Sequence, residues 1–185
     1  METFEKILRK YPRDAYALQM AYFLALTTGH TQKLRDIPAS VVTEYTTSTP
    51  FYGHLHGKLC FGQGETGDYV SGELSGRLAL DYLPLDNWAH HALAHNFEES
   101  GRPLQVTFSN DDIILNVCNC QGSKFLSHTE DQWTQGTTFS LHLWWHEALL
   151  HLQLGDTQAA LDLYDNTVGP RALKGNSKKN VKDQD

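Results

Sequence analysis

The sequence predicts an all-α fold of stacked helical repeats, and the positions of its glycines and prolines are the observations that indicate this fold. Four apolar stretches each end at a glycine, and the steps between successive glycines are 38, 34 and 54 residues. A proline lies 17 residues before each of the first three glycines. Glycine suits a helix end because it tolerates the left-handed conformation, and proline favours a helix start. The glycines are Gly29, Gly67, Gly101 and Gly155, and the prolines are Pro12, Pro50 and Pro84.

The four stretches are expected to be the first helices of successive helix–turn–helix units. They read YALQMAYFLALTTG at 16–29, FYGHLHGKLCFGQGETG at 51–67, NWAHHALAHNFEESG at 87–101 and LHLWWHEALLHLQLG at 141–155. A step of 34 residues is the period of the tetratricopeptide repeat. We therefore expect one tetratricopeptide-like helical-repeat solenoid over residues 1–170, in which each helix pair packs on the next.

Local signals fit these helix positions. Asp14 and Asp86 follow their prolines by two residues, where an aspartate can cap a helix N-terminus. The pattern G-D-x-x-x-A at 155–160 places Asp156 at the start of a second helix. Gly53 and Gly57 are four residues apart and share one helix face, which predicts that another helix approaches closely there.

Two segments do not fit the repeat. The last glycine step exceeds the repeat period by about 20 residues, which map onto PLQVTFSNDDIILNVCNCQG at 103–122. This segment is rich in Val, Ile and Thr around a turn signal, so we expect a non-helical insertion, either a loop or a hairpin. The end of the chain, 171–185, holds five of the fifteen basic residues and almost no apolar ones, which predicts a disordered basic tail.

Composition excludes several classes of protein. The 185 residues carry a net charge of −7, which argues against broad binding to nucleic acid. The longest apolar stretch, 21–26, is far too short to span a bilayer. Cys60, Cys118 and Cys120 form no CxxC pair, so they predict free thiols in a reducing compartment rather than a zinc ribbon. We expect a cytoplasmic protein with no cofactor and with neither nucleic acid nor membrane as its partner.

The segment HEALLH at 146–151 resembles the zinc-protease pattern H-E-x-x-H but has one residue too many. A helix turns by about 100° per residue, so His146 and His151 point about 140° apart. One zinc ion cannot easily bind both imidazoles from one regular helix. Glu147 and His151, four residues apart, are expected to form an ordinary side-chain pair.

Other histidines have a more favourable spacing. His91, His95 and Glu98 fall within about 60° on one helix face, and His142 and His146 form a second pair at i, i+4. Two imidazoles and a carboxylate are ligand types of catalytic zinc and non-haem iron sites. If adjacent repeats bring the two pairs together, these five residues would form a metal site. The favoured interpretation is that they pack or lie on the surface, and no metal is assigned.

Several longer segments resemble the tetratricopeptide repeat protein 38 family. They are PFYGHLHG at 50–57, DNWAHHALAHNFEESGR at 86–102, SKFLSHTEDQW at 123–133 and HLWWHEALLHLQLGDTQAALDLYD at 142–165. The likeness covers most of residues 2–172, apart from 103–122. The family is longer than this chain, has Asn where Leu143 stands, and has no segment like 103–122. The resemblance therefore implies a truncated or alternatively spliced form.

The resemblance implies an intracellular helical superhelix that binds other proteins, and it implies no enzymatic mechanism. We therefore expect a scaffold that binds a protein or peptide in a concave groove. The alternative is a metal-dependent hydrolase-like enzyme built on the histidine and glutamate side chains, and a third possibility is a fragment without function. The expected groove residues come from the first helix of each repeat: His54, Trp88, His91, His95, His142 and His146.

Overall fold

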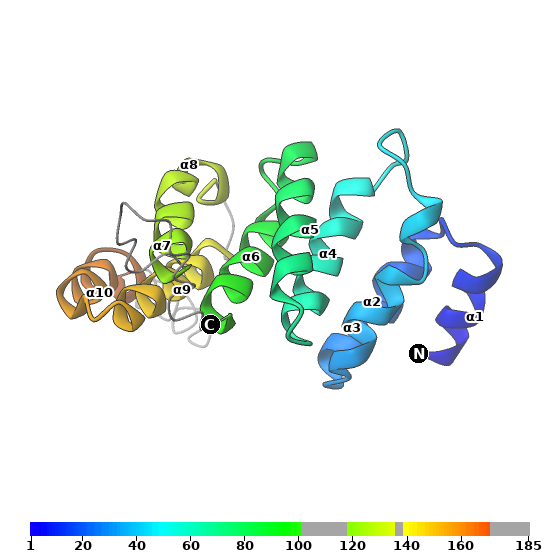
Figure 1. Ribbon diagram of the computed structural model, residues 1–185, viewed down its shortest axis with the longest axis horizontal. Helices are drawn as coiled ribbons and strands as arrows, with labels where there is room; N and C mark the ends of the chain where they lie inside the picture. Colours follow the sequence, from blue (N-terminus) through cyan, green and yellow to red (C-terminus); the bar gives the residue numbers. More distant parts are fainter. Residues whose placement is uncertain (101–117, 136–138, 171–185) are drawn as a thin grey trace, which may run out of the picture. The chain divides into compact units, whose positions relative to one another are not determined.

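The computed structural model describes residues 1–100, 118–135 and 139–170, and within these ranges every regular element is a helix (Figure 1). The predicted all-α class is confirmed for this part of the chain. The chain divides into two compact units, the N-terminal unit Met1–Ser100 and the C-terminal unit Gly101–Asp185. The continuous solenoid expected over 1–170 stays a prediction, and the expected tail at 171–185 lies outside the described residues. None of the described helices has the length and apolar character needed to cross a lipid bilayer.

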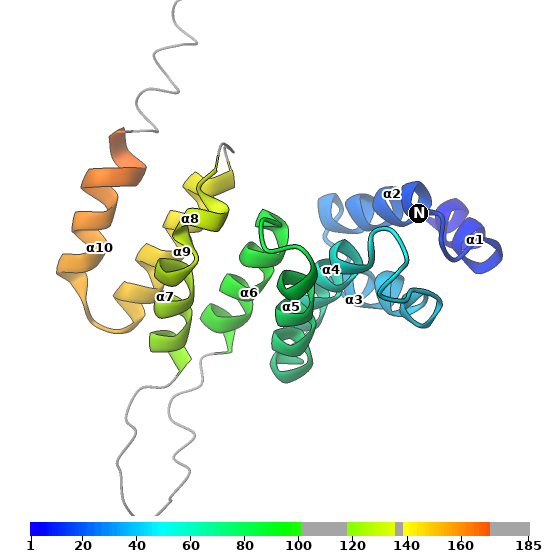
Figure 2. The ribbon, with the colours of Figure 1, turned by 90° about the horizontal axis from the view of Figure 1, so that it is seen from above.

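The N-terminal unit is built from six α-helices and a short 3-10 helix that follow one another in chain order (Figure 2). Helix α4 is central, because it packs against α3, α5 and α6. Helices α2 and α3 pack on each other, and α1 packs on α2. The elements are α1 (Glu2–Lys10), α2 (Ala15–Thr27), α3 (Thr31–Ala39), η1 (Val42–Glu44), α4 (Tyr52–Gly64), α5 (Tyr69–Tyr82) and α6 (Asn87–Glu99).

Three of the four predicted glycine corners are confirmed. Gly29 follows α2 and Gly67 follows α4, with φ angles of 71° and 82°. Gly155 follows the later helix α9 (Phe139–Gln153), with a φ angle of 77°. These angles lie in the left-handed region, where a side chain would clash with the backbone and glycine does not. Gly101, the fourth predicted corner, lies outside the described residues.

Aspartate caps fix the helix starts as expected. The Asp14 carboxylate accepts a hydrogen bond from the Ala17 N–H at the start of α2. Asp86 accepts one from the Trp88 N–H at the start of α6. Each cap satisfies a backbone donor that has no partner within its own helix. Helices α2 and α6 therefore begin shortly after Pro12 and Pro84, and this sets which side chains each helix presents.

Glycines on α4 allow its neighbours to approach closely. A Cβ added to Gly57 would lie 3.4 Å from the Ala89 Cβ of α6, and one added to Gly53 would lie 2.8 Å from the Leu83 side chain. The predicted close approach at Gly53 and Gly57 is thereby confirmed. At Gly62 an added Cβ would overlap the backbone of Leu34 in α3. Small residues thus set how tightly α4 packs between α3 and α6.

The C-terminal unit contains a second set of packed helices. Helix α9 packs against α7 on one side and α10 on another. The Trp133 indole N–H donates to the Leu126 carbonyl at 3.1 Å, and its ring meets that of Trp144 edge to face at 5.4 Å. The elements are α7 (Cys118–His128), α8 (Glu130–Trp133), α9 (Phe139–Gln153), α10 (Thr157–Leu163) and the π-helical turn η2 (Tyr164–Val168).

The expected non-helical insertion at 103–122 is wrong for its last residues. Helix α7 begins at Cys118, so 118–122 are helical, while 101–117 lie outside the described residues. The helix continues into a stretch whose Leu126 is fully buried and which packs on α9. Packing of this apolar face supports a helix where the local composition alone indicated a loop.

Candidate functional site

Side chains from α2, α4 and α6, which the sequence predicts to be first helices of repeats, come together in the N-terminal unit. We call Tyr22, Lys58 and Trp88 the first-helix triad. The Tyr22 hydroxyl donates to the Lys58 carbonyl at 3.3 Å, and the two aromatic rings meet edge to face at 6.0 Å. The Lys58 ammonium lies 4.9 Å from the Tyr22 ring centre and 5.9 Å from that of Trp88. Both distances are within the range of a cation–π contact.

Lys58 is the electrostatic centre of this triad. Burial lowers the pKa of its ammonium, and the charge of Asp86 opposes that change. Among the described residues, no carboxylate forms an ion pair with Lys58. A partly desolvated cation on aromatic faces gains strongly from an anion that reaches it, because the local dielectric constant is low.

Asp86 links the start of α6 to α4. His54 Nδ1 donates to the Asp86 carboxylate at 2.8 Å, and the Asp86 side chain is only 8% exposed. Burial alone would raise the pKa of Asp86, but the hydrogen bond and charge of His54, with the N–H groups of Trp88 and Ala89, lower it. Asp86 is therefore held ionised while it caps α6 and orients His54.

A cavity of about 570 Å³ opens beside the triad, between α2 and α4. Most of its lining is apolar, and Lys58 supplies a cation, an arrangement that is typical of ligand pockets. Two aromatic residues at its edge are strongly exposed, Tyr16 at 70% and Phe51 at 54%. The lining residues are Ala15, Tyr16, Leu18, Gln19, Phe51, His54, Leu55 and Lys58.

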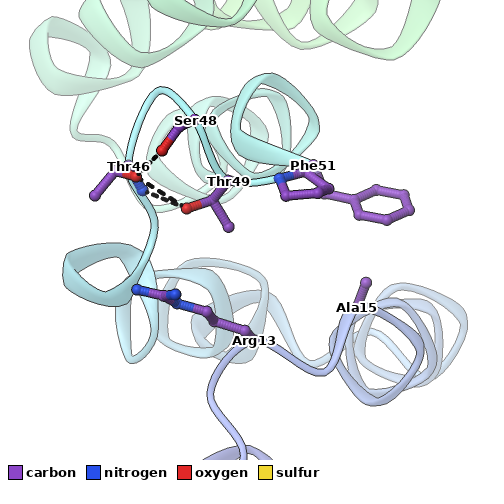
Figure 3. Close-up of a pocket in the computed structure, with 7 residues that line it drawn as sticks. Arg13, Ala15, Thr46, Ser48, Thr49 and Phe51 are labelled. Carbon is purple, nitrogen blue, oxygen red and sulfur yellow. Dashed lines mark hydrogen bonds between the residues drawn. The ribbon is translucent and has the colours of Figure 1, made fainter.

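Phe51 adopts an unusual backbone conformation at the rim of this cavity. Its φ is 68°, and it is the only residue other than glycine with a positive φ among those described. Such a conformation is strained for a bulky side chain. Phe51 also lines a second, smaller cavity of about 350 Å³, which includes Arg13. There Thr46 hydrogen-bonds to the Ser48 hydroxyl at 3.0 Å and, through both its N–H and its hydroxyl, to the Thr49 hydroxyl at 2.9 and 3.1 Å (Figure 3).

Further along α6, a cluster of aromatic and imidazole rings continues from Trp88. Phe61 of α4 stacks on the His91 imidazole, with ring centres 5.5 Å apart and planes 18° from parallel. Trp88 lies 5.1 Å from Phe61 and 5.2 Å from His91, centre to centre. His95 meets both Phe61 and His91 edge to face, at 5.1 and 4.5 Å. These contacts fix the imidazole orientations on α6.

His95 also brings two carboxylates together. Its Nδ1 lies 3.3 Å from Glu99 Oε1 on the same helix and 3.6 Å from Glu65 Oε1 at the end of α4. One donor atom from each of the three residues lies within 4.8 Å of the other two. Burial and the neighbouring Glu99 raise the pKa of Glu65, while His95 opposes the rise. In this cluster His95 is joined by Glu65 and Glu99, whereas the sequence pattern had indicated Glu98.

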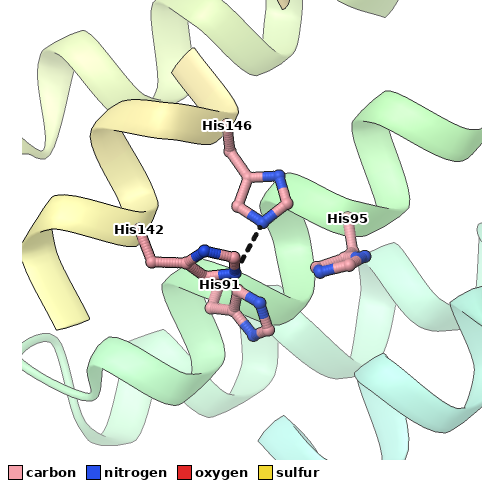
Figure 4. A group of neighbouring side chains, drawn as sticks. All are labelled: His91, His95, His142 and His146. Carbon is pink, nitrogen blue, oxygen red and sulfur yellow. Dashed lines mark hydrogen bonds between the residues drawn. The ribbon is translucent and has the colours of Figure 1, made fainter. Parts of the chain in front are cut away.

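In the C-terminal unit, the histidine pair predicted on α9 is present. His142 and His146 are hydrogen-bonded through their Nε2 atoms at 3.2 Å (Figure 4). The Ser127 hydroxyl donates to the Glu147 carboxylate at 2.6 Å, and Ser123 and His151 are hydrogen-bonded at 3.2 Å. The three polar residues of the HEALLH segment thus hydrogen-bond to different partners, in line with the expected divergence of His146 and His151. The expected Glu147–His151 pair forms no hydrogen bond among the described contacts, although the charge of His151 opposes the rise in the pKa of Glu147.

The structure places the predicted groove residues in two sets. His54, Trp88, His91 and His95 lie on α4 and α6 of the N-terminal unit, and His142 and His146 lie on α9 of the C-terminal unit. The convergence of the two histidine pairs, and with it the five-residue metal site, stays a prediction. Sequence reasoning missed Tyr22, Phe51, Lys58, Glu65 and Glu99.

No protein-family model matches the chain, and no solved structure matches it.

Proposed function

We propose that the protein is a helical-repeat scaffold of tetratricopeptide type, related to the tetratricopeptide repeat protein 38 family, that binds a protein or peptide partner. The binding surface is the first-helix face of α2, α4 and α6, including the cavity beside Lys58. The observation that carries the proposal is the combination of exposed aromatic rings at the cavity edge with a partly desolvated lysine inside it. Repeat proteins bind extended peptides or helices along the face formed by corresponding helices.

The charge of this surface favours a particular class of peptide. Lys58 forms no ion pair with any described residue, so an acidic side chain of the partner can pair with it. Tyr16 and Phe51 offer apolar area to the neighbouring side chains of that peptide. Charged groups set orientation and specificity, while aromatic anchors supply most of the binding energy. The partner segment therefore combines an Asp or Glu with a nearby apolar residue.

Selection of displayed random peptides on the full chain tests this proposal. The selected sequences should be enriched in Asp or Glu next to apolar residues, and synthetic versions should bind in solution. Lys58→Met should weaken their binding by about tenfold or more, the equivalent of about 1.4 kcal/mol. Tyr16→Ala should weaken it through lost apolar contact.

Leu74→Ala is the matched control, because Leu74 is 67% exposed but lies on the second helix α5. Binding should be unchanged in this variant. Equal affinity of the Lys58→Met, Tyr16→Ala and wild-type proteins for every selected peptide would reject the first-helix face as the binding surface. Circular dichroism of each variant shows whether the fold is kept.

A further inference from the structure

Glu65, His95 and Glu99 form a compact set of metal-type donors within the N-terminal unit. Glu65 directly follows α4, and His95 and Glu99 are one turn apart on α6. Donor atoms of all three residues lie within 4.8 Å of one another, although they come from two helices. The side chains are 24 to 38% exposed, so an ion can enter from solvent and keep water ligands.

The separations in this ion-pair cluster also come close to those between two ligands of one ion. Charge-assisted N–H···O contacts are about 2.7–2.9 Å long, whereas His95 Nδ1 is 3.3 Å from Glu99 and 3.6 Å from Glu65. Two ligands bonded to a tetrahedral zinc ion at about 2.1 Å stand about 3.4 Å apart. The separations of the His95 nitrogen from the two carboxylate oxygens therefore already match those between ligands of one ion.

The ligand types and the limited mobility of the His95 ring also favour a metal ion. In the deprotonated forms that metal ligands adopt, two carboxylates and an imidazole carry a net charge of −2 toward a divalent cation. The His95 ring is held edge to face by both Phe61 and His91, which limits its reorientation. A nitrogen donor beside oxygen donors favours a transition metal such as Zn²⁺, while Mg²⁺ prefers oxygen ligands alone.

We propose that Glu65, His95 and Glu99 bind one Zn²⁺ ion, with His95 Nδ1 as the nitrogen ligand and water in the remaining position. The ion joins the end of α4 to the last turn of α6. It thereby fixes the distance between α4 and α6 at this end. The site is separate from the cavity beside Lys58 and does not depend on peptide binding.

Calorimetric titration of the full chain, produced without a histidine tag and stripped with a chelator, tests the site. Zinc should bind with saturable affinity, and the thermal midpoint should rise with zinc concentration because the ion binds the folded state. Glu65→Gln, His95→Gln and Glu99→Gln should each reduce zinc affinity by at least about tenfold, the loss that even outer partners of metal ligands cause. Magnesium should give no comparable shift.

Glu98→Gln is the matched control, because it removes a charge from the neighbouring position of the same helix. It should leave zinc affinity unchanged. If His95→Gln abolishes binding while Glu65→Gln and Glu99→Gln do not, the ion is held by other donors and the proposal is overturned. Zinc affinity that is equally low in the wild type and in all three ligand variants also overturns it, because the cluster is then an ion-pair network only.

Discussion

At the residue scale, Phe51 combines a strained backbone with an exposed ring. Its left-handed conformation costs about 1–2 kcal/mol for a residue with a side chain, and its ring is 54% exposed, so little burial compensates for this cost. The residue directly precedes α4, as its N-cap, and lines both cavities. This combination is expected where a side chain is kept for binding rather than for stability.

Phe51→Gly should therefore stabilise the fold while it weakens peptide binding. We expect the free energy of unfolding in urea to rise by about 1 kcal/mol, because glycine adopts the same conformation without strain. Phe51→Ala removes the ring but keeps the strain, and serves as the control. A glycine variant that is no more stable than the alanine variant would show that the backbone is not strained at this position.

At the residue scale too, the hydrogen bond between Asp86 and His54 should make a pH-dependent contribution to the free energy of unfolding. The folded pKa of Asp86 is lowered, so its contribution is fully present above the unfolded value of about 3.9 and is lost as the pH falls through the folded pKa. A double-mutant cycle with Asp86→Asn and His54→Gln should give a coupling of about 1 kcal/mol at neutral pH. The coupling should shrink below about pH 4. Coupling that is constant down to pH 2 would contradict this assignment.

At the scale of elements, the packing of α4 depends on glycines whose surroundings differ. Gly62→Ala would place a Cβ against the Leu34 backbone, which cannot move without shifting α3. We expect a loss of about 2–3 kcal/mol in the free energy of unfolding. Gly57→Ala meets ordinary contacts at 3.4 Å and gains helix propensity, so it should be neutral or stabilising by up to about 1 kcal/mol. Urea unfolding of both variants measures the difference, and equal losses would refute a specific α3–α4 contact.

At the scale of the whole molecule, local rules explain what the sequence could predict. The corners at Gly29 and Gly67 and the caps at Asp14 and Asp86 depend on backbone conformation and on neighbours a few residues away. Such features follow from residue type and spacing, and so does the all-α class. The start of α7 at Cys118 could not be predicted from residue type and spacing. Packing on α9 supports a helix there, in a segment with little helix preference of its own.

The candidate site could be predicted only in part, for a geometric reason. Helical spacing placed His91 and His95 on one face, but it could not select between Glu98 and Glu99, which both lie near His95 on α6. That choice depends on where Glu65 lies at the end of α4, and hence on how closely two helices pack. The approach of Lys58 to the Tyr22 ring depends likewise on the packing of α2 and α4.

The division of the chain leads to a prediction for the N-terminal unit as a separate protein. Its helices α1 to α6 pack in an unbroken series of contacts, and its buried apolar residues come from several of these helices. A fragment comprising 1–100 should therefore be helical by circular dichroism and unfold in urea in a single cooperative transition, with a slope of about 1 kcal/mol per molar urea. Gly62→Ala should lower the midpoint of the fragment as it does that of the full chain, which links the transition to native packing. A gradual, non-cooperative loss of helix signal would show that the unit does not fold as one body, because cooperative unfolding requires energetic coupling between its helices.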